Sequence, residues 1–334
     1  MVLMVSYVSP VPDNNKSEKQ FVTKIEPTVI VTPTETVQWK TYHMVITLKI
    51  SDKGKLWMPV PEEWDGAGMK NVVINSITPT PDDLYQEPQG NLIAYWDMYL
   101  HDTDTYSIDF QSDLAPIIYF IDLEKIGEYD QESELYQRYT APSNEIKSNN
   151  QEIINLAKQI VGEESNPYFQ AKLIHKWVSE NISSGNYADS LETIKNKSGD
   201  YGGHSNPAVA FLRSLKIPAR SVGGLWTDYK TGRMINVDTK NGYGWGHIWS
   251  EFYLPNYGWI QFDTSAGLQN FAEIDQSRLI LYHGEDIELG NGYPYIRVPF
   301  FHTPQVDWPA NSGFPVTNIW GDSLSLKIEL VDQQ

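Results

Sequence analysis

The chain of 334 residues contains no cysteine. This absence excludes disulfide bonds, a thiolate nucleophile, zinc–thiolate sites and iron–sulfur clusters, because all of them need cysteine sulfur. It also means that cysteine usage carries no information about the compartment of the protein. Any reaction or binding must therefore depend on other side chains.

Positive charge is also scarce. Lysine and arginine number 25 against 43 aspartates and glutamates, which gives a formal net charge of -18. Nucleic acids and anionic lipids would be repelled, and no basic run offsets the acidity locally. We therefore expect no nucleic-acid partner, whereas a peptide or protein ligand is compatible with the charge.

Long hydrophobic runs and ligand-binding motifs are missing too. The apolar stretch at residues 1–8 is too short to span a membrane and lacks the basic start of a signal peptide. Neither a glycine-rich phosphate loop nor a histidine pair at metal-ligand spacing occurs. We expect no membrane insertion, no cofactor and no metal. The oligomeric state and the compartment stay open.

The residues that are present have the composition of a folded protein, with 40% hydrophobic and 13% aromatic residues. Apolar alternation broken by Gly, Pro and Asp turns predicts short antiparallel strands in the first part, and helical spacing follows later. In the strand expected at residues 43–50, Met44, Ile46, Leu48 and Ile50 share one face. We predict an α+β protein in five parts: an extended arm (1–37), an N-terminal antiparallel β-sandwich domain (38–120), an acidic surface linker (121–150), a mixed domain (151–275) and a C-terminal β-rich extension (276–334).

Three helices are predicted in the mixed domain. The first runs from about Gln151 to Val161, and the second starts at Pro167, a residue that suits a first helical turn. Pro207 is expected to open the third helix, with Ser205 or Asn206 as its N-cap. Strands are predicted at residues 219–225, 246–254 and 259–263.

The last two of these strands bring a histidine and an aspartate together. Residues 255–258 are turn formers, so His247 and Asp263 lie on neighbouring antiparallel strands. A three-residue loop places Asp263 opposite Trp249 and on the face of His247, whereas a four-residue loop reverses that parity unless a bulge restores it. A carboxylate beside an imidazole fixes its tautomer and stabilises its protonated form, as a base in acyl transfer requires.

Three segments carry a family resemblance. They are 199–220, which contains Arg213 and ends in Lys-Ile-Pro-Ala-Arg; 246–254, Gly-His-Ile-Trp-Ser-Glu-Phe-Tyr-Leu; and 257–263, Tyr-Gly-Trp-Ile-Gln-Phe-Asp. In this order they resemble the transglutaminase-like superfamily, which has a papain-like cysteine protease and transglutaminase fold. The resemblance implies that His247 is the catalytic histidine and Asp263 its acidic partner. The family's cysteine, twelve positions before Arg213, falls on Tyr201.

A tyrosine cannot easily replace the thiolate that the resemblance implies at the start of a helix. Its ordinary pKa is about 10, against about 8.5 for cysteine, and an aryl oxide attacks amides less readily. The ring is also longer and would fill the space for an acyl group. We predict that Gly202, Trp245 and Trp249 contact the ligand in this cleft.

Several residues also have plainer interpretations. Tyr201 is expected to be a partly buried aromatic residue whose hydroxyl bonds to His247. His204 is interpreted as a helix-entry residue, and Ser205 as a helix cap rather than a substitute nucleophile. Arg220 is expected to be structural and to hold a carboxylate or carbonyl groups.

The favoured hypothesis is a catalytically silent transglutaminase-like protein that binds a peptide-like ligand in the remaining cleft. One alternative is an active thiol-type hydrolase or acyltransferase whose native cysteine at position 201 was replaced. Another is a non-enzymatic protein that interacts through its β domains. That last alternative predicts an occluded cleft in which His247 and Asp263 are unpaired.

Overall fold

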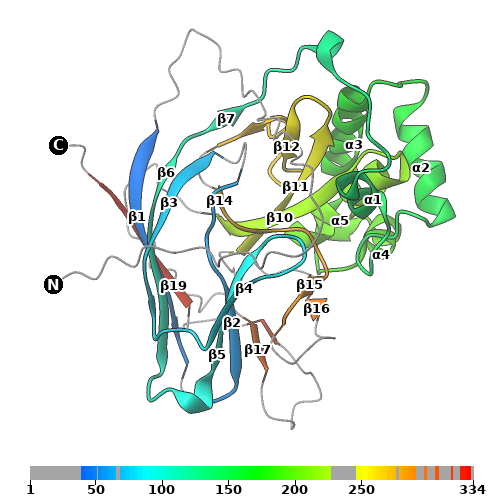
Figure 1. The fold of residues 1–334 in the computed structure, drawn as a ribbon. Helices are drawn as coiled ribbons and strands as arrows, with labels where there is room; N and C mark the ends of the chain where they lie inside the picture. Colours follow the sequence, from blue (N-terminus) through cyan, green and yellow to red (C-terminus); the bar gives the residue numbers. More distant parts are fainter. Residues whose placement is uncertain are drawn as a thin grey trace, which may run out of the picture.

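The computed structural model describes residues 39–50, 52–64, 68–226, 246–275, 278–290, 297–298, 305–307, 317–318 and 324–331. The predicted arm at residues 1–37 and Trp245 lie outside these ranges. Figure 1 shows long, twisted strands on one side of the molecule and a group of helices on the other.

Two antiparallel sheets form the N-terminal β-sandwich. The first has the order β19-β1-β6-β3 and the second β18-β17-β2-β5-β4. The strands are β1 (Lys40–Lys49), β2 (Lys55–Pro59), β3 (Met69–Thr78), β4 (Asp83–Gln86), β5 (Leu92–Asp97), β6 (Thr105–Leu114), β17 (Gln305–Asp307), β18 (Thr317–Asn318) and β19 (Leu324–Leu330).

The alternating pattern of β1 determines which of its faces is buried. Met44, Ile46 and Leu48 point into the sandwich and are fully or almost fully buried, as the spacing of two predicts. They pack in one apolar cluster with side chains of β2, β5 and β6, in which Trp96 and Tyr106 meet edge to face at 5.5 Å between ring centroids. Large aromatic rings therefore fill the centre of the sandwich.

The C-terminal strands complete this sandwich. β19 pairs antiparallel with β1, and β17 pairs antiparallel with β2. Without β19 and β17, one edge of β1 and one edge of β2 would have unpaired backbone N–H and C=O groups. Segments far apart in the sequence thus lie side by side in both sheets (Figure 1).

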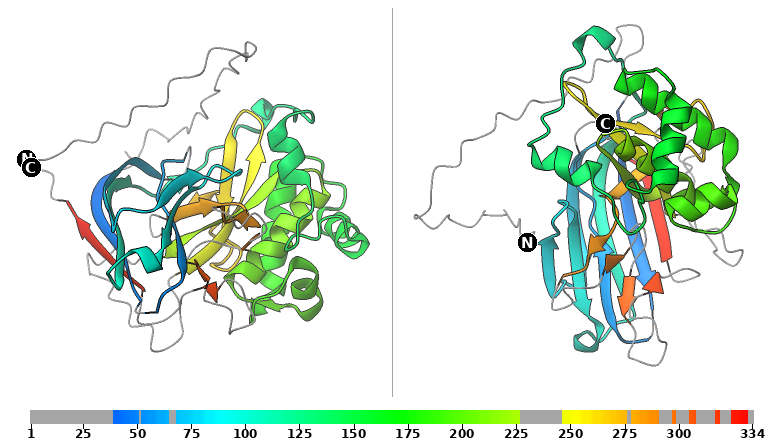
Figure 2. Two further views of the ribbon diagram at one scale, coloured as in Figure 1. Left: turned by 60° about the horizontal axis from the view of Figure 1, so that its bottom comes forward. Right: turned by 90° about the vertical axis from the view of Figure 1, so that its right-hand side faces the viewer.

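The α+β half consists of helices packed on a third sheet, with the strand order β12-β11-β10-β14. Its elements are α1 (Glu134–Thr140), α2 (Gln151–Val161), α3 (Pro167–Asn181), α4 (Ser190–Asn196), α5 (Tyr201–Ser214), β10 (Ala219–Trp226), β11 (Gly246–Leu254), β12 (Gly258–Phe262) and β14 (Arg278–His283). Figure 2 shows the helices gathered on one side of this sheet. The predicted α2 and the predicted start of α3 are confirmed.

The remaining elements are short. They are the 3₁₀ turns η1 (Met98–Leu100) and η2 (Leu123–Lys125), and the strands β7 (Ile117–Ile118), β8 (Ser183–Ser184), β9 (Ser198–Gly199), β13 (Glu273–Ile274), β15 (Ile287–Glu288) and β16 (Arg297–Val298). They pair as β7 with β13, β8 with β9, and β15 with β16.

The predicted start of the third helix was wrong. Helix α5 begins at Tyr201, and Asp200 caps it by accepting a hydrogen bond from the Gly203 N–H at 2.8 Å. Pro207 therefore lies inside the helix, where it lacks the N–H that would bond to the Gly203 carbonyl. Burial of the whole run 202–213 outweighs that loss, because the helix is packed on every side.

The predicted surface linker also differs from the structure. Segment 121–150 contains η2 and α1, and it buries Tyr139 and Ile146. The Tyr139 ring meets Trp259 of β12 edge to face at 5.1 Å between ring centroids. The segment therefore contributes individual side chains to the core of the α+β half, while most of its residues are half-buried or exposed.

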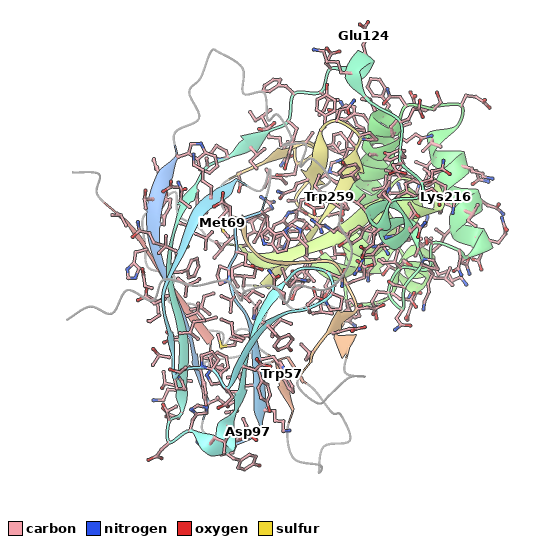
Figure 3. The ribbon with its side chains drawn as sticks, in the orientation of Figure 1. Trp57, Met69, Asp97, Glu124, Lys216 and Trp259 are labelled. Carbon is pink, nitrogen blue, oxygen red and sulfur yellow. The ribbon has the colours of Figure 1, made fainter. Side chains whose placement is uncertain are left out.

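The two halves share apolar clusters. Leu225, Leu279 and Leu281 of the third sheet belong to the sandwich core cluster. A second cluster joins Trp57 of β2 (Figure 3) to Ile248 and to other buried residues of both halves. The predicted α+β fold class is confirmed. No helix in the described ranges is long and apolar enough to cross a membrane.

Candidate functional site

The β11–β12 hairpin brings His247 and Asp263 together. Leu254 pairs with Gly258 and Ser250 with Phe262, so the loop has the three residues 255–257 and Asp263 follows opposite Trp249. This is the three-residue alternative of the two that the sequence allowed. His247 Nε2 lies 2.7 Å from Asp263 Oδ2, and both side chains are buried.

This contact assigns different tasks to the two ring nitrogens of His247. A carboxylate only accepts hydrogen bonds, so Nε2 carries the proton that bonds to Asp263. In a neutral ring, Nδ1 is then the nitrogen that can accept a proton. The pair therefore has the orientation that a general base needs.

Asp263 is anchored from several sides. Arg278 of β14 donates to Oδ2 from Nε at 3.0 Å and from Nη2 at 2.8 Å, and Ser265 donates to Oδ1 from its backbone N–H and its hydroxyl. Burial raises the pKa of Asp263, but His247, Arg278 and Ser265 favour the charged form more strongly and leave this pKa well below its usual value. The carboxylate is therefore charged at neutral pH.

Aromatic rings surround the His247 imidazole. Its centroid lies 4.6 Å from that of Trp226, 5.9 Å from that of Trp249 and 5.9 Å from that of Tyr201. Trp249 stacks on the imidazole and donates its indole N–H to Gln261 Oε1 at 2.8 Å. Its side chain is buried, so in this structure it supports the histidine, and ligand contact by Trp249 stays a prediction.

Tyr201 occupies the first position of α5. The short parallel pair of β8 and β9 leads directly into Asp200, the N-cap of the helix. Gly199 packs closely against the first turn of α5. A Cβ at position 199 would lie only 2.8 Å from Gly203 Cα, so the position favours glycine. Gly202 follows in the first turn and is buried, beside the position that the family resemblance gives to the nucleophile.

The Tyr201 ring is part of the cluster that joins the two halves. It packs against a cluster of buried side chains from the sandwich, the third sheet and the segment 287–289: Trp57, Ile93, Tyr95, Ile248, Tyr282, Ile287 and Leu289. Burial raises the pKa of Tyr201, and the charge of Asp200 raises it further. The phenol is therefore protonated at neutral pH and is a weak nucleophile.

His204 and Ser205 lie in the next turn of α5. The Ser205 hydroxyl contacts Ser250 Oγ at 2.8 Å and donates to the Trp249 carbonyl at 3.0 Å, so it fastens the helix to β11 and does not cap it. The His204 carbonyl accepts a hydrogen bond from Thr264 Oγ1 at 3.1 Å. Burial lowers the pKa of His204, which keeps its ring neutral.

Arg213 and Arg220, the two arginines of the first family-like segment, form buried ion pairs. Arg213 pairs with Glu285 at 2.6 Å and donates to the carbonyls of Ala141 and Ala219. Arg220 pairs with Glu251 and lies over the ring of Trp259, with 4.1 Å to the ring centroid. Trp259 is labelled in Figure 3. The prediction that Arg220 holds a carboxylate is confirmed.

Sequence reasoning missed Arg278, Ser265 and Trp226 at this site. Arg278 lies on β14, which reaches the site only because β14 pairs with β10, and no local pattern indicates that pairing. Of the predicted ligand contacts, Trp245 falls outside the described residues. In the described part of the chain, no group of three His, Asp or Glu side chains is placed to hold a metal.

Comparison with protein families agrees with the geometry. Residues 154–264, which include α5, β10, β11, β12 and Asp263, match the model of the transglutaminase-like superfamily. The chain therefore carries a transglutaminase-like domain. Position 201 of this domain is a tyrosine, and the chain offers no cysteine elsewhere.

Proteins similar in sequence to this chain occur in bacteria. An uncharacterised protein of Haemophilus influenzae is 22% identical over 325 residues, which are 86% of each chain. The uncharacterised protein YebA of Bacillus subtilis is 33% identical over 90 residues, which cover 25% of this chain and 12% of YebA.

Solved structures are similar as well. A candidate cysteine protease from Cytophaga hutchinsonii has a TM-score of 0.49 at 15% identity, covering 88% of this chain and 98% of that one. The periplasmic domain of TgpA from Pseudomonas aeruginosa has a TM-score of 0.36 at 14% identity, covering 74% of this chain and 91% of that domain.

Proposed function

We propose that this protein is a catalytically silent transglutaminase-like protein that binds a peptide-like ligand beside His247. The observation that carries the proposal is the combination of an oriented His247–Asp263 pair, 2.7 Å apart, with a tyrosine at the start of α5. In this proposal His247 corresponds to the base of an acyl-transfer site, and Tyr201, a protonated phenol, stands at the position of its nucleophile.

The chemistry of Tyr201 supports this proposal. A nucleophile at a helix N-terminus gains from the helix dipole only if it becomes an anion. Burial and the neighbouring Asp200 both oppose ionisation of the phenol. The ring also contributes to the apolar cluster between the two halves, so it has a packing role that needs no reactivity.

The paired state of His247 speaks against a purely structural domain. If the third alternative held, the two side chains would have no reason to be aligned, and we expected them to be unpaired. Instead Asp263 is held by Arg278 and Ser265 and accepts from His247. Such anchoring fixes the tautomer and the direction of the imidazole ring, as a general base requires.

The direct test restores a cysteine at position 201. We expect Tyr201→Cys to hydrolyse fluorogenic peptides or to transfer an amine to glutamine-containing peptides, while the unaltered protein does neither. The matched controls are Tyr201→Ser, which has a small hydroxyl, and the double variant Tyr201→Cys/His247→Ala, which lacks the base. Both should remain inactive.

Binding is tested separately with the unaltered protein. Glutamine-containing N-acetyl peptides should bind in calorimetry, and His247→Ala should weaken their binding. Efficient turnover by the unaltered protein that disappears in Tyr201→Phe would contradict the proposal, because the tyrosine would then be a working nucleophile. If none of the peptides bound, the part of the proposal that assigns peptide binding to this site would be wrong.

A further inference from the structure

A concave site lies on α3, away from Tyr201 in the sequence. It has a cavity volume of about 490 Å³. Its lining comes from the first ten residues of α3, from Glu164 before the helix and from the loop after Asp263: Glu164, Phe169, Lys172, Leu173, His175, Lys176, Leu268 and Phe271. The size lies within the range of small-molecule sites, roughly 300 to 1,000 Å³.

The cavity wall is apolar and partly open to solvent. Phe169 is 37% exposed and Leu268 is 51% exposed, although both are large hydrophobic side chains. Phe169 and Leu173 are four residues apart and so share one face of α3. A ligand with an apolar body would remove this surface from water, which is favourable in proportion to the area covered.

The rim of the cavity is basic. Lys172 and Lys176 are also four residues apart and form a second stripe of α3 beside the apolar one. Within the described ranges neither lysine forms an ion pair with a carboxylate, although the chain has a net charge of -18. Glu164 also lines the cavity, and one of its carboxylate oxygens accepts the Asn166 N–H at 2.7 Å, so two lysines face one carboxylate at the rim.

We propose that this cavity binds a small apolar carboxylate, with its aryl or medium-length alkyl body on Phe169, Leu173 and Leu268 and its anionic group at Lys172 and Lys176. The charge of the rim selects an anion, and the wall selects an apolar body. A cation or a polar sugar fits neither feature. The inference does not depend on the proposed function at His247.

The far wall of the cavity belongs to the loop that begins at Asp263. The buried His175 ring lines the cavity and donates from Nε2 to the Asp263 carbonyl at 3.2 Å. Ser179 donates to the Thr264 carbonyl at 3.0 Å, and the Asp263 N–H donates to the Asn270 carbonyl at 2.7 Å. A ligand packed on Leu268 and Phe271 therefore stabilises segment 264–271.

The test uses octanoate as the probe, in calorimetry with the full chain at low salt. Octanoate should bind, and the double variant Lys172→Gln/Lys176→Gln should weaken its binding at least about tenfold, which is about 1.4 kcal/mol. The matched control is Lys158→Gln, an exposed lysine of α2 outside the cavity, which should leave the affinity unchanged. Tyr201→Cys should also leave it unchanged, which separates this site from the proposed peptide site.

Two further measurements give the proposal a location and a specificity. Octanoate should slow amide hydrogen exchange in segment 264–271, and Leu268→Gln should abolish that protection. Neutral 1-octanol should bind much more weakly than octanoate. The proposal is overturned if octanoate does not bind at millimolar concentration, if 1-octanol binds equally well, or if the lysine and control variants behave alike.

Discussion

His247 and Arg278 donate to the same carboxylate oxygen, Oδ2 of Asp263, at 2.7 Å and 2.8 Å. One side chain comes from β11 and the other from β14, the strands on either side of β10. The shared oxygen joins three segments of the third sheet around one buried charge. Arg278 is thus a positioning residue for Asp263, and through it for His247.

Removal of Arg278 should destabilise the protein. Arg278→Leu leaves the buried Asp263 without its arginine partner, and breaking such a buried pair costs about 3 to 5 kcal/mol. Urea denaturation at pH 7 should show that loss. Lys125→Leu, which breaks an exposed pair with Asp122, is the control and should cause no measurable change. Equal midpoints for the two variants would contradict the structural role of Arg278.

Asp263 should make stability depend on pH in the acid range. Its pKa in the folded protein is well below its usual value, so its stabilising effect is complete above pH about 4 and declines as the pH falls toward the folded-state pKa. Unfolding free energies measured from pH 6 to pH 2.5 should therefore fall less steeply in Asp263→Asn than in the unaltered protein. Parallel curves would show that Asp263 is not held as described.

Two buried histidines should make stability depend on pH nearer neutrality than Asp263 does. Burial lowers the pKa of His175 and of His204 below the ordinary value near 6.5. As the pH falls, these two side chains therefore become protonated in the unfolded chain before they do in the folded protein. Stability should fall as the pH decreases below about 6.5, by up to about 1.4 kcal/mol per pH unit for each histidine. Denaturation at pH 7.5, 6.5 and 5.5 checks this, and His175→Asn should reduce the slope. An unchanged slope in that variant would exclude His175 as a contributor.

Tyr201 should contribute to stability through its ring. Tyr201→Ala removes an aromatic side chain from the cluster between the halves and should cost about 3 kcal/mol, near the lower end for a buried aromatic because the ring is only partly buried. Tyr201→Phe keeps the ring and should cost much less. Thermal and urea unfolding of the two variants give the comparison. If both cost the same, the hydroxyl rather than the ring matters at this position.

Local patterns were sufficient to predict several of the longer elements of the fold. The alternation of Met44, Ile46 and Leu48 predicted the buried face of β1, and apolar spacing predicted α2 and the start of α3. The turn at 255–257 limited the pairing of His247 with Asp263 to two registers. In each case the deciding interactions lie within one strand, one helix or one hairpin.

Longer-range features were not predictable in this way. Asp200 rather than Ser205 caps α5, because the β8–β9 pair and the burial of the whole helix outweigh the local preference around Pro207. The segment around Tyr139 looked like a surface linker, yet its aromatic ring packs on Trp259. These outcomes depend on packing partners that local spacing does not reveal.

The sequence by itself determined that no thiol chemistry is possible, that the fold is α+β, and that a histidine and an aspartate share a hairpin. The tertiary structure decided that Arg278 joins them, that Tyr201 packs against the sandwich, and that β17 and β19 complete the N-terminal sheets. The physical reason is the separation along the chain of the residues that interact. Composition and short-range spacing act along the chain, whereas burial, sheet closure and charge pairing depend on segments that meet only after folding.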